Sequence, residues 1–209
     1  MIRKISLFLL ITGFSVSVYY SFQYYQAKQS VEELPETLQN KPDENNGGGL
    51  QEGIEGLGDS EKKVEINPST LEQDIETGLE IATLDIPALN QSFTTYWGTD
   101  ENTLRQGVGL YVSEWTTVPN RERGHTVLSG HRDTVFTGLG ELGKGDTLEI
   151  QYNGQHFQYE IEDTWITDAD DRTVIVKKDE PTLTLTTCYP FNYIGNAPDR
   201  YIVQATLVD

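Results

Sequence analysis

The stretch PTLTLTTCYPFNYIGNAPDRYIV (residues 181–203) contains the only cysteine of the chain, Cys188. Threonine and leucine alternate from Thr182 to Thr186, which predicts a half-buried strand that ends near Cys188. After a loop rich in proline, asparagine and glycine, a second alternating run begins at Arg200. The two runs therefore predict a thiol at the end of one strand and a guanidinium at the start of the next.

A lone cysteine has no partner for a disulfide within the chain, so Cys188 is either a packed apolar side chain or a reactive thiol. A buried, inert thiol is the more common case. The end of a strand beside a polar loop, however, is typical of the partly exposed positions where reactive cysteines occur. This position favours reactivity.

Further runs upstream predict an all-β fold. The pair Asn153-Gly154 predicts a tight hairpin turn, because it supplies positive φ angles. Thr99 or Asp100 caps a short helix that ends at Gly107 or Gly109. With the two C-terminal strands this gives a seven- to eight-stranded β-barrel with short helices, since closure removes exposed strand edges. The other strands are expected at residues 79–86, 93–97, 110–112, 125–129, 148–152 and 157–167.

The first 27 residues predict a membrane anchor. Arg3 and Lys4 precede an uncharged run at residues 5–25, and about 20 apolar residues cross a roughly 30 Å hydrocarbon core. Basic residues on the short N-terminal side predict a cytoplasmic N-terminus and an extracellular remainder. The alternative is a signal peptide cleaved near Ser15-Val16-Ser17. Apolar and aromatic residues continue beyond that site, which favours a single-pass anchor that is retained.

Residues 28–77 predict a flexible acidic linker, because they combine low hydrophobicity with high charge. A short helix at residues 68–77 is a local alternative. The whole chain carries 33 acidic against 15 basic residues and a net charge of −18. This balance excludes nucleic acid as a partner, because phosphate binding needs clustered lysine and arginine. The compact domain is expected at residues 78–209.

The three histidines differ in their expected roles. His156 follows the hairpin turn and is expected to be a surface residue. His125 and His131 lie on one face of a strand but about 20 Å apart, too far for one metal ion. His131 follows Gly130 at a strand end, where an imidazole can act as a base. A cysteine, a histidine and an arginine at strand ends permit nucleophilic acyl transfer.

No metal site or cofactor is expected. The run Asp168-Ala-Asp-Asp171 is acidic enough to bind a cation weakly, but a solvated turn is the favoured explanation. No other group of carboxylates has the spacing of a calcium loop.

Two motifs resemble those of the sortases, cysteine transpeptidases on the surface of Gram-positive bacteria. The motifs are Thr184-Leu-Thr-Thr-Cys188 with Arg200 downstream, and Leu128-Ser-Gly-His-Arg-Asp133 upstream. The Gly-His-Arg-Asp run and the Tyr-Pro-Phe that begins at Tyr189 are most similar to class D sortases of Bacillus. The resemblance covers roughly residues 78–209 and implies that they form a catalytic sortase β-barrel.

The resemblance implies a role for each motif residue. Cys188 is the nucleophile that attacks the threonine carbonyl of a Leu-Pro-x-Thr sorting signal, and His131 is the general acid and base. Arg200 holds the substrate carbonyl or the oxyanion. Thr187 and Tyr189, which flank the cysteine, are expected to bind substrate. The partners implied are secreted proteins that carry the signal and an amine of peptidoglycan.

Two other function classes stay open at this stage. The same residues suit a cysteine endopeptidase without transfer, and a non-catalytic surface-binding barrel would make Cys188 incidental. Leu34-Pro35-Glu36-Thr37 spells a signal core inside the linker, either by chance composition or as a weak pseudosubstrate. The resemblance assigns no role to His125 or to Asp199.

Overall fold

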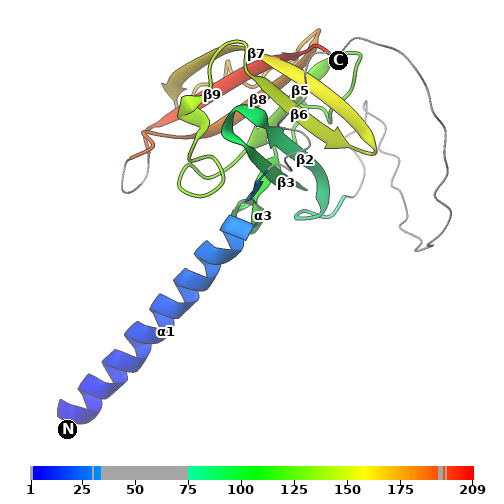
Figure 1. Cartoon of the computed structure of the whole chain (residues 1–209). Coiled ribbons are helices and arrows are strands. Elements are labelled where there is room, and N and C mark those ends of the chain that lie inside the picture. Colours follow the sequence, from blue (N-terminus) through cyan, green and yellow to red (C-terminus); the bar gives the residue numbers. More distant parts are fainter. Residues whose placement is uncertain (1, 30, 34–74, 193–194, 196) are drawn as a thin grey trace, which may run out of the picture.

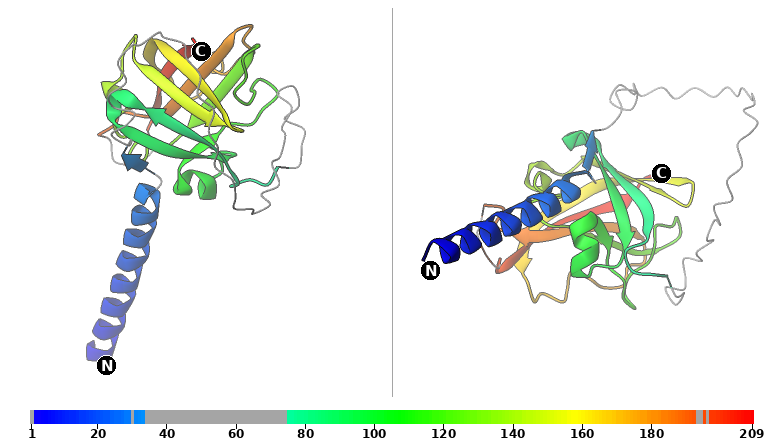
Figure 2. Two further views of the ribbon diagram at one scale, coloured as in Figure 1. Left: turned by 45° about the vertical axis from the view of Figure 1, so that its right-hand side comes forward. Right: turned by 90° about the horizontal axis from the view of Figure 1, so that it is seen from below.

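The computed structural model describes residues 2–29, 31–33, 75–192, 195 and 197–209 (Figure 1). Within them, eight strands form a closed β-barrel in the order β3-β2-β6-β7-β9-β8-β5-β4, and β4 pairs again with β3. The predicted all-β barrel is confirmed, and Figure 2 shows it from two further sides. The barrel strands are β2 (Glu80–Ile86), β3 (Gln91–Trp97), β4 (Val108–Leu110), β5 (Gly124–Ser129), β6 (Thr147–Tyr152), β7 (Gln155–Asp168), β8 (Pro181–Tyr189) and β9 (Asp199–Leu207).

The helical elements are short, apart from the first. They are α1 (Ile2–Gln29), η1 (Pro87–Leu89), α3 (Glu101–Gln106) and η2 (Leu139–Glu141). As predicted, Asp100 caps α3: its carboxylate accepts hydrogen bonds from the main-chain N–H groups of Asn102 and Thr103. Asn153 and Gly154 adopt φ angles of 50° and 74°, so the predicted hairpin turn between β6 and β7 is also confirmed.

Alternation along the strands separates an inner from an outer face of the barrel. On β8, Leu183 and Leu185 are fully buried in the hydrophobic core, together with Val203 of β9. Thr184, Thr186 and Cys188 have the opposite parity and so lie on the outer face of β8. The nucleophile candidate therefore sits outside the barrel core.

The barrel closes where β3 and β4 run parallel, with Thr95 opposite Val108 and Trp97 opposite Leu110. We expected this strand at residues 110–112, two residues later than it occurs. The shift arises because the chain enters the sheet directly after α3, and a Cβ on Gly109 would lie 2.3 Å from the carbonyl oxygen of Gly98. Only glycine fits this close approach.

A ninth strand, β1 (Val31–Glu33), lies inside the segment predicted to be a flexible linker. It pairs antiparallel with Gln91–Phe93 of β3, the half of β3 that β4 leaves unpaired. A strand edge with free N–H and C=O groups is a favourable place for such an addition. The linker motif Leu34-Pro35-Glu36-Thr37 and the alternative helix up to residue 74 lie outside the described residues.

Helix α1 occupies the stretch of the predicted membrane anchor and extends away from the barrel (Figure 1). Within the part of the chain that the structure describes, no helix is long and apolar enough to span a membrane. The expected span is therefore not confirmed.

The close approach at Gly109 generates a stability prediction. Gly109→Ala is expected to lower the free energy of unfolding by about 1–3 kcal/mol or more, because the new methyl group collides with backbone rather than with a movable side chain. Gly143→Ala is the matched control, since nothing lies within 4 Å of a Cβ there. Denaturant titration of both variants measures the difference. Equal stability of the two would contradict the closure described above.

Candidate active site

Three strands bring the predicted catalytic residues to one edge of the barrel. β5 runs parallel to β8 with Ser129 opposite Thr186. β9 runs antiparallel to β8 with Cys188 directly opposite Arg200, and directly opposed residues have Cβ atoms about 4.5–5.5 Å apart. β8 thus has the end of β5 on one side and the start of β9 on the other.

Hydrogen bonds to β8 hold the residue before His131 in place. The N–H of Gly130 donates to the carbonyl of Thr186 at 3.2 Å, and the hydroxyl of Thr187 donates to the carbonyl of Gly130 at 2.7 Å. The chain then turns, and the N–H of Phe136 donates to the carbonyl of His131 at 3.0 Å. His131 therefore begins its turn beside the end of β8, the strand that carries Cys188.

Cys188 is a free, half-buried cysteine on the outer face of β8. It is not part of the hydrophobic core, which removes the main argument for an inert packed thiol. Partial exposure beside a guanidinium is a setting typical of reactive cysteines.

Arg200 is anchored by its own loop. Its Nη1 donates to the main-chain carbonyl of Asp199 at 2.9 Å and to that of Ala197 at 3.4 Å. Asp199 pairs with Tyr189 and so has the opposite parity to Arg200. The contact between the two neighbours runs through the main-chain carbonyl of Asp199, and alternation along β9 assigns the Asp199 side chain to the face opposite to that of Arg200.

The two residues that flank Cys188 face the inner side. Thr187 is buried and donates its hydroxyl to Gly130. Tyr189 lies 6.3 Å from the Tyr201 ring and 5.6 Å from the Phe191 ring, measured between centroids. These contacts support the strand ends, and the expected contact of Thr187 and Tyr189 with substrate stays a prediction.

Further contacts position the loop between β8 and β9, and sequence reasoning missed them. Arg132, next to His131, donates from Nη2 to the carbonyl of Gly195 at 2.9 Å. Phe191 packs so tightly over Gly140 that a Cβ there would lie 2.8 Å from the ring. The only sequence signal was the cluster of aromatic residues on either side of the loop.

A cavity of about 700 Å³ lies on the outer face beside these residues. Ser129 and Thr186 line it. Ser129 ends β5 two residues before His131, and Thr186 lies two residues before Cys188 on the same face of β8. Arg200 lines it as well, so the cavity leads up to the catalytic candidates. Its other lining residues are Tyr111, Trp115, Ile202 and those at positions 167–172 and 174–176.

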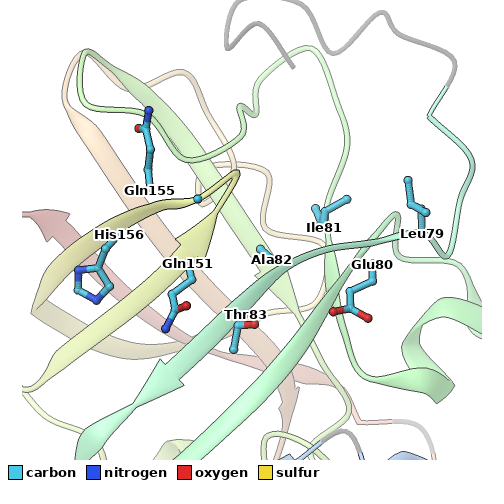
Figure 3. A pocket seen from close by; sticks show the side chains of 9 residues that line it. Leu79, Glu80, Ile81, Ala82, Thr83, Gln151, Gln155 and His156 are labelled. Carbon is cyan, nitrogen blue, oxygen red and sulfur yellow. The ribbon is translucent and has the colours of Figure 1, made fainter. Parts of the chain in front are cut away.

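A second hollow of about 650 Å³ lies between the start of β2 and the β6–β7 turn. Figure 3 shows its polar lining, including Glu80, Gln151 and His156. His156 is exposed and its Nε2 lies 2.9 Å from Oε2 of Glu149, as expected of a surface histidine. Arg200 lines the first cavity, whereas none of the three catalytic candidates lines this hollow, so the first cavity is the candidate site.

The acidic run at residues 168–171 forms a turn beside the cavity. The carboxylate of Asp168 accepts from the N–H of Asp170, and that of Asp171 accepts from the N–H of Thr173, both at 2.8 Å. Hydrogen bonds from the hydroxyls of Thr167 and Thr173 lower the pKa of Asp171. Among the described residues, no group of three His, Cys, Asp or Glu side chains could hold a metal ion.

Known proteins resemble the chain over this domain. Residues 84–208 match the family model described as a sortase domain. Sortase D of Bacillus subtilis (strain 168) is 46% identical over 134 residues, which cover 64% of this chain and 66% of the relative, just under two thirds of its length.

Solved structures resemble it too. The catalytic domain of B. anthracis SrtD is 56% identical with a TM-score of 0.57, over 67% of this chain and 95% of that one. Clostridium perfringens sortase C, solved with the C-terminal cell wall sorting motif, is 27% identical with a TM-score of 0.59. The match covers 65% of this chain and 74% of that one.

The Thr187 hydroxyl allows a test of how the strand ends are joined. Thr187→Val keeps the side-chain shape but leaves the buried carbonyl of Gly130 without this donor. The loss of this hydrogen bond is expected to lower the free energy of unfolding by about 1–3 kcal/mol. Thr206→Val, on the half-buried part of β9, is the control and is expected to change stability by less than about 0.5 kcal/mol. Thermal unfolding compares them, and a Thr187 variant as stable as the control would refute the role of this bond.

Proposed function

The chain belongs to the sortase family of cysteine transpeptidases, and from this membership we propose its reaction. Its barrel, residues 78–209, cleaves a Leu-Pro-x-Thr-type sorting signal after the threonine and transfers the new acyl group to an amine. The observation that carries the proposal is the strand register that sets Cys188 opposite Arg200 and holds Gly130 against β8.

The first half of the reaction forms an acyl-enzyme. The thiolate of Cys188 attacks the threonine carbonyl carbon, and a tetrahedral intermediate with a negative oxygen forms. As that intermediate collapses, the C–N bond breaks and His131, as imidazolium, protonates the departing amine. A thioester to Cys188 and a free amine remain.

Arg200 is suited to stabilise the oxyanion. A guanidinium carries five N–H donors, and the hydrogen bonds described above use Nη1 only. Those bonds fix the group on its loop while it lines the cavity, which is the preorganisation that makes electrostatic stabilisation effective.

The second half transfers the acyl group. An incoming amine loses a proton to neutral His131, attacks the thioester, and releases the Cys188 thiolate. We assign the amine to peptidoglycan because sortases join secreted proteins to the cell wall. The structure of C. perfringens sortase C with the C-terminal cell wall sorting motif supports a signal peptide as the donor. The apolar side chains of Val174, Ile175 and Ile202 suit the leucine and proline of a Leu-Pro-x-Thr signal.

The signal itself is tested by intact-mass spectrometry of the full chain with a panel of Leu-Pro-x-Thr peptides. The wild type is expected to gain the mass of the peptide acyl group, and Cys188→Ala is expected to gain none. His131→Ala and Arg200→Lys are expected to lower the rate of adduct formation about 10²–10³-fold, because each removes a group that acts in the transition state.

Adding excess amine separates the transfer from simple cleavage. A transpeptidase releases the amide of the added amine, whereas an endopeptidase releases only the free acid. A wild-type chain that forms no adduct with any peptide of the panel is instead a non-catalytic surface-binding barrel.

We also propose that the N-terminal 27 residues hold the barrel on the outer side of the cell membrane. The uncharged run at residues 5–25 behind Arg3 and Lys4 supports this, as does the cell-surface association of sortases in Gram-positive bacteria. The full chain is expected to stay with membranes through an alkaline carbonate wash, and a chain that begins at residue 28 is expected to be released. Release of both would disprove the anchor.

A further inference from the structure

The family resemblance left His125 without a role, and the structure gives it an unusual environment. The side chain is fully buried, with 0% of its surface exposed, on the outer face of β5. Its Nδ1 lies 2.8 Å from the carbonyl oxygen of Val176 in the β7–β8 loop, and its Nε2 lies 2.8 Å from the hydroxyl of Thr184 on β8. One imidazole thus joins β5, β8 and the loop.

The two partners determine the tautomer. A carbonyl oxygen only accepts, so Nδ1 of His125 carries the proton and donates to Val176. Nε2 of the neutral ring then accepts from the hydroxyl of Thr184. A second proton on Nε2 would force the Thr184 hydroxyl to accept where it now donates, and would place a charge in a site without solvent.

The segment that His125 holds is a wall of the active-site cavity. Val174, Ile175 and Val176 line the cavity from the loop. Ser129 and Thr186 line the same cavity from the strands, and they follow His125 and Thr184 on the same outer faces of β5 and β8. The imidazole therefore sets the distance between the loop and the strands that lead to His131 and Cys188.

The charges around His125 disfavour its protonation. Burial is the main cause that lowers the pKa of His125, the Val176 carbonyl opposes it, and the positive charge of Lys178 lowers the pKa further. Lys178 itself donates to Gln204 of β9 at 3.1 Å. From the segment before β5, the N–H of Thr117 meets the main-chain carbonyl of His125. None of these contacts brings a carboxylate to the ring.

From this geometry we propose that His125 is a positioning residue: as a neutral imidazole it fastens the β7–β8 loop as a wall of the signal-binding cavity, and its protonation frees that wall. The signal-binding part of this statement rests on the proposed function. Because the anchored loop favours the neutral ring, anchoring is complete above the ordinary histidine pKa of about 6.5 and weakens as the pH falls below it.

The loop itself is tested without any activity. Hydrogen exchange of residues 172–180 is followed in the full chain at pH 7.5 and 5.5, with correction for the intrinsic exchange rate. The protection factor of the wild type is expected to fall about five- to tenfold at pH 5.5, the effect of losing roughly one buried hydrogen bond. His125→Gln, which can donate and accept but does not titrate, is expected to remove this pH dependence.

Two further variants control the measurement. His156→Gln replaces the exposed histidine of the second hollow (Figure 3) and is expected to behave like the wild type. Thr184→Val removes the hydroxyl partner and is expected to lower the protection at both pH values. The proposal is overturned if the wild-type loop is equally protected at both pH values, or if its pH dependence persists in His125→Gln.

Peptide kinetics connect the loop to the reaction. For a Leu-Pro-x-Thr peptide, KM of the wild type is expected to rise about five- to tenfold from pH 7.5 to 5.5, and His125→Gln is expected to abolish this rise. The pH profile of kcat is expected to be the same in both. If no peptide reacts at any pH, the proposed function fails, and hydrogen exchange still decides the role of His125.

Discussion

The pairing of β8 with a parallel strand on one side and an antiparallel strand on the other is the constraint on which the site depends. β5 approaches β8 in the same direction, so both strands end at the same edge. β9 leaves from that edge in the opposite direction. Only this combination brings the ends of two strands and the start of a third together, and each contributes one residue: His131, Cys188 and Arg200.

The inner face of β8 contributes to the stability of the fold, and its outer face carries the nucleophile candidate. Leu183 and Leu185 point into the barrel and are fully buried, whereas the outer face of β8 carries threonines and then Cys188. Burying the leucines stabilises the fold by about 1.5–3 kcal/mol each. Because the cysteine is on the other face, its reactivity does not depend on opening the core.

The strands, and the positions of the three motif residues at strand ends, could be predicted from sequence because their signals are local. Alternation identified β8, and the pair Asn153-Gly154 marked the hairpin of β6 and β7. The walls of the cavity could not be predicted, since Trp115, Val176 and Arg200 line one cavity only after the barrel closes. The early start of β4 was missed for the same reason: the contact of Gly109 with Gly98 joins segments that have no common pattern.

The three histidines show how environment assigns different roles to one side chain. His156 is exposed beside Glu149, and water screens their interaction. His131 is half-buried just beyond the end of β5, where the proposed reaction needs an imidazole. His125 lies within β5 and is sealed by Val176 and Thr184, so it has no access to substrate. Spacing along β5 alone could not separate the last two, because burial of His125 comes from a loop that is distant in sequence. His125 on β5 and His131 just beyond its end thus lie close together in the chain but differ in what covers them.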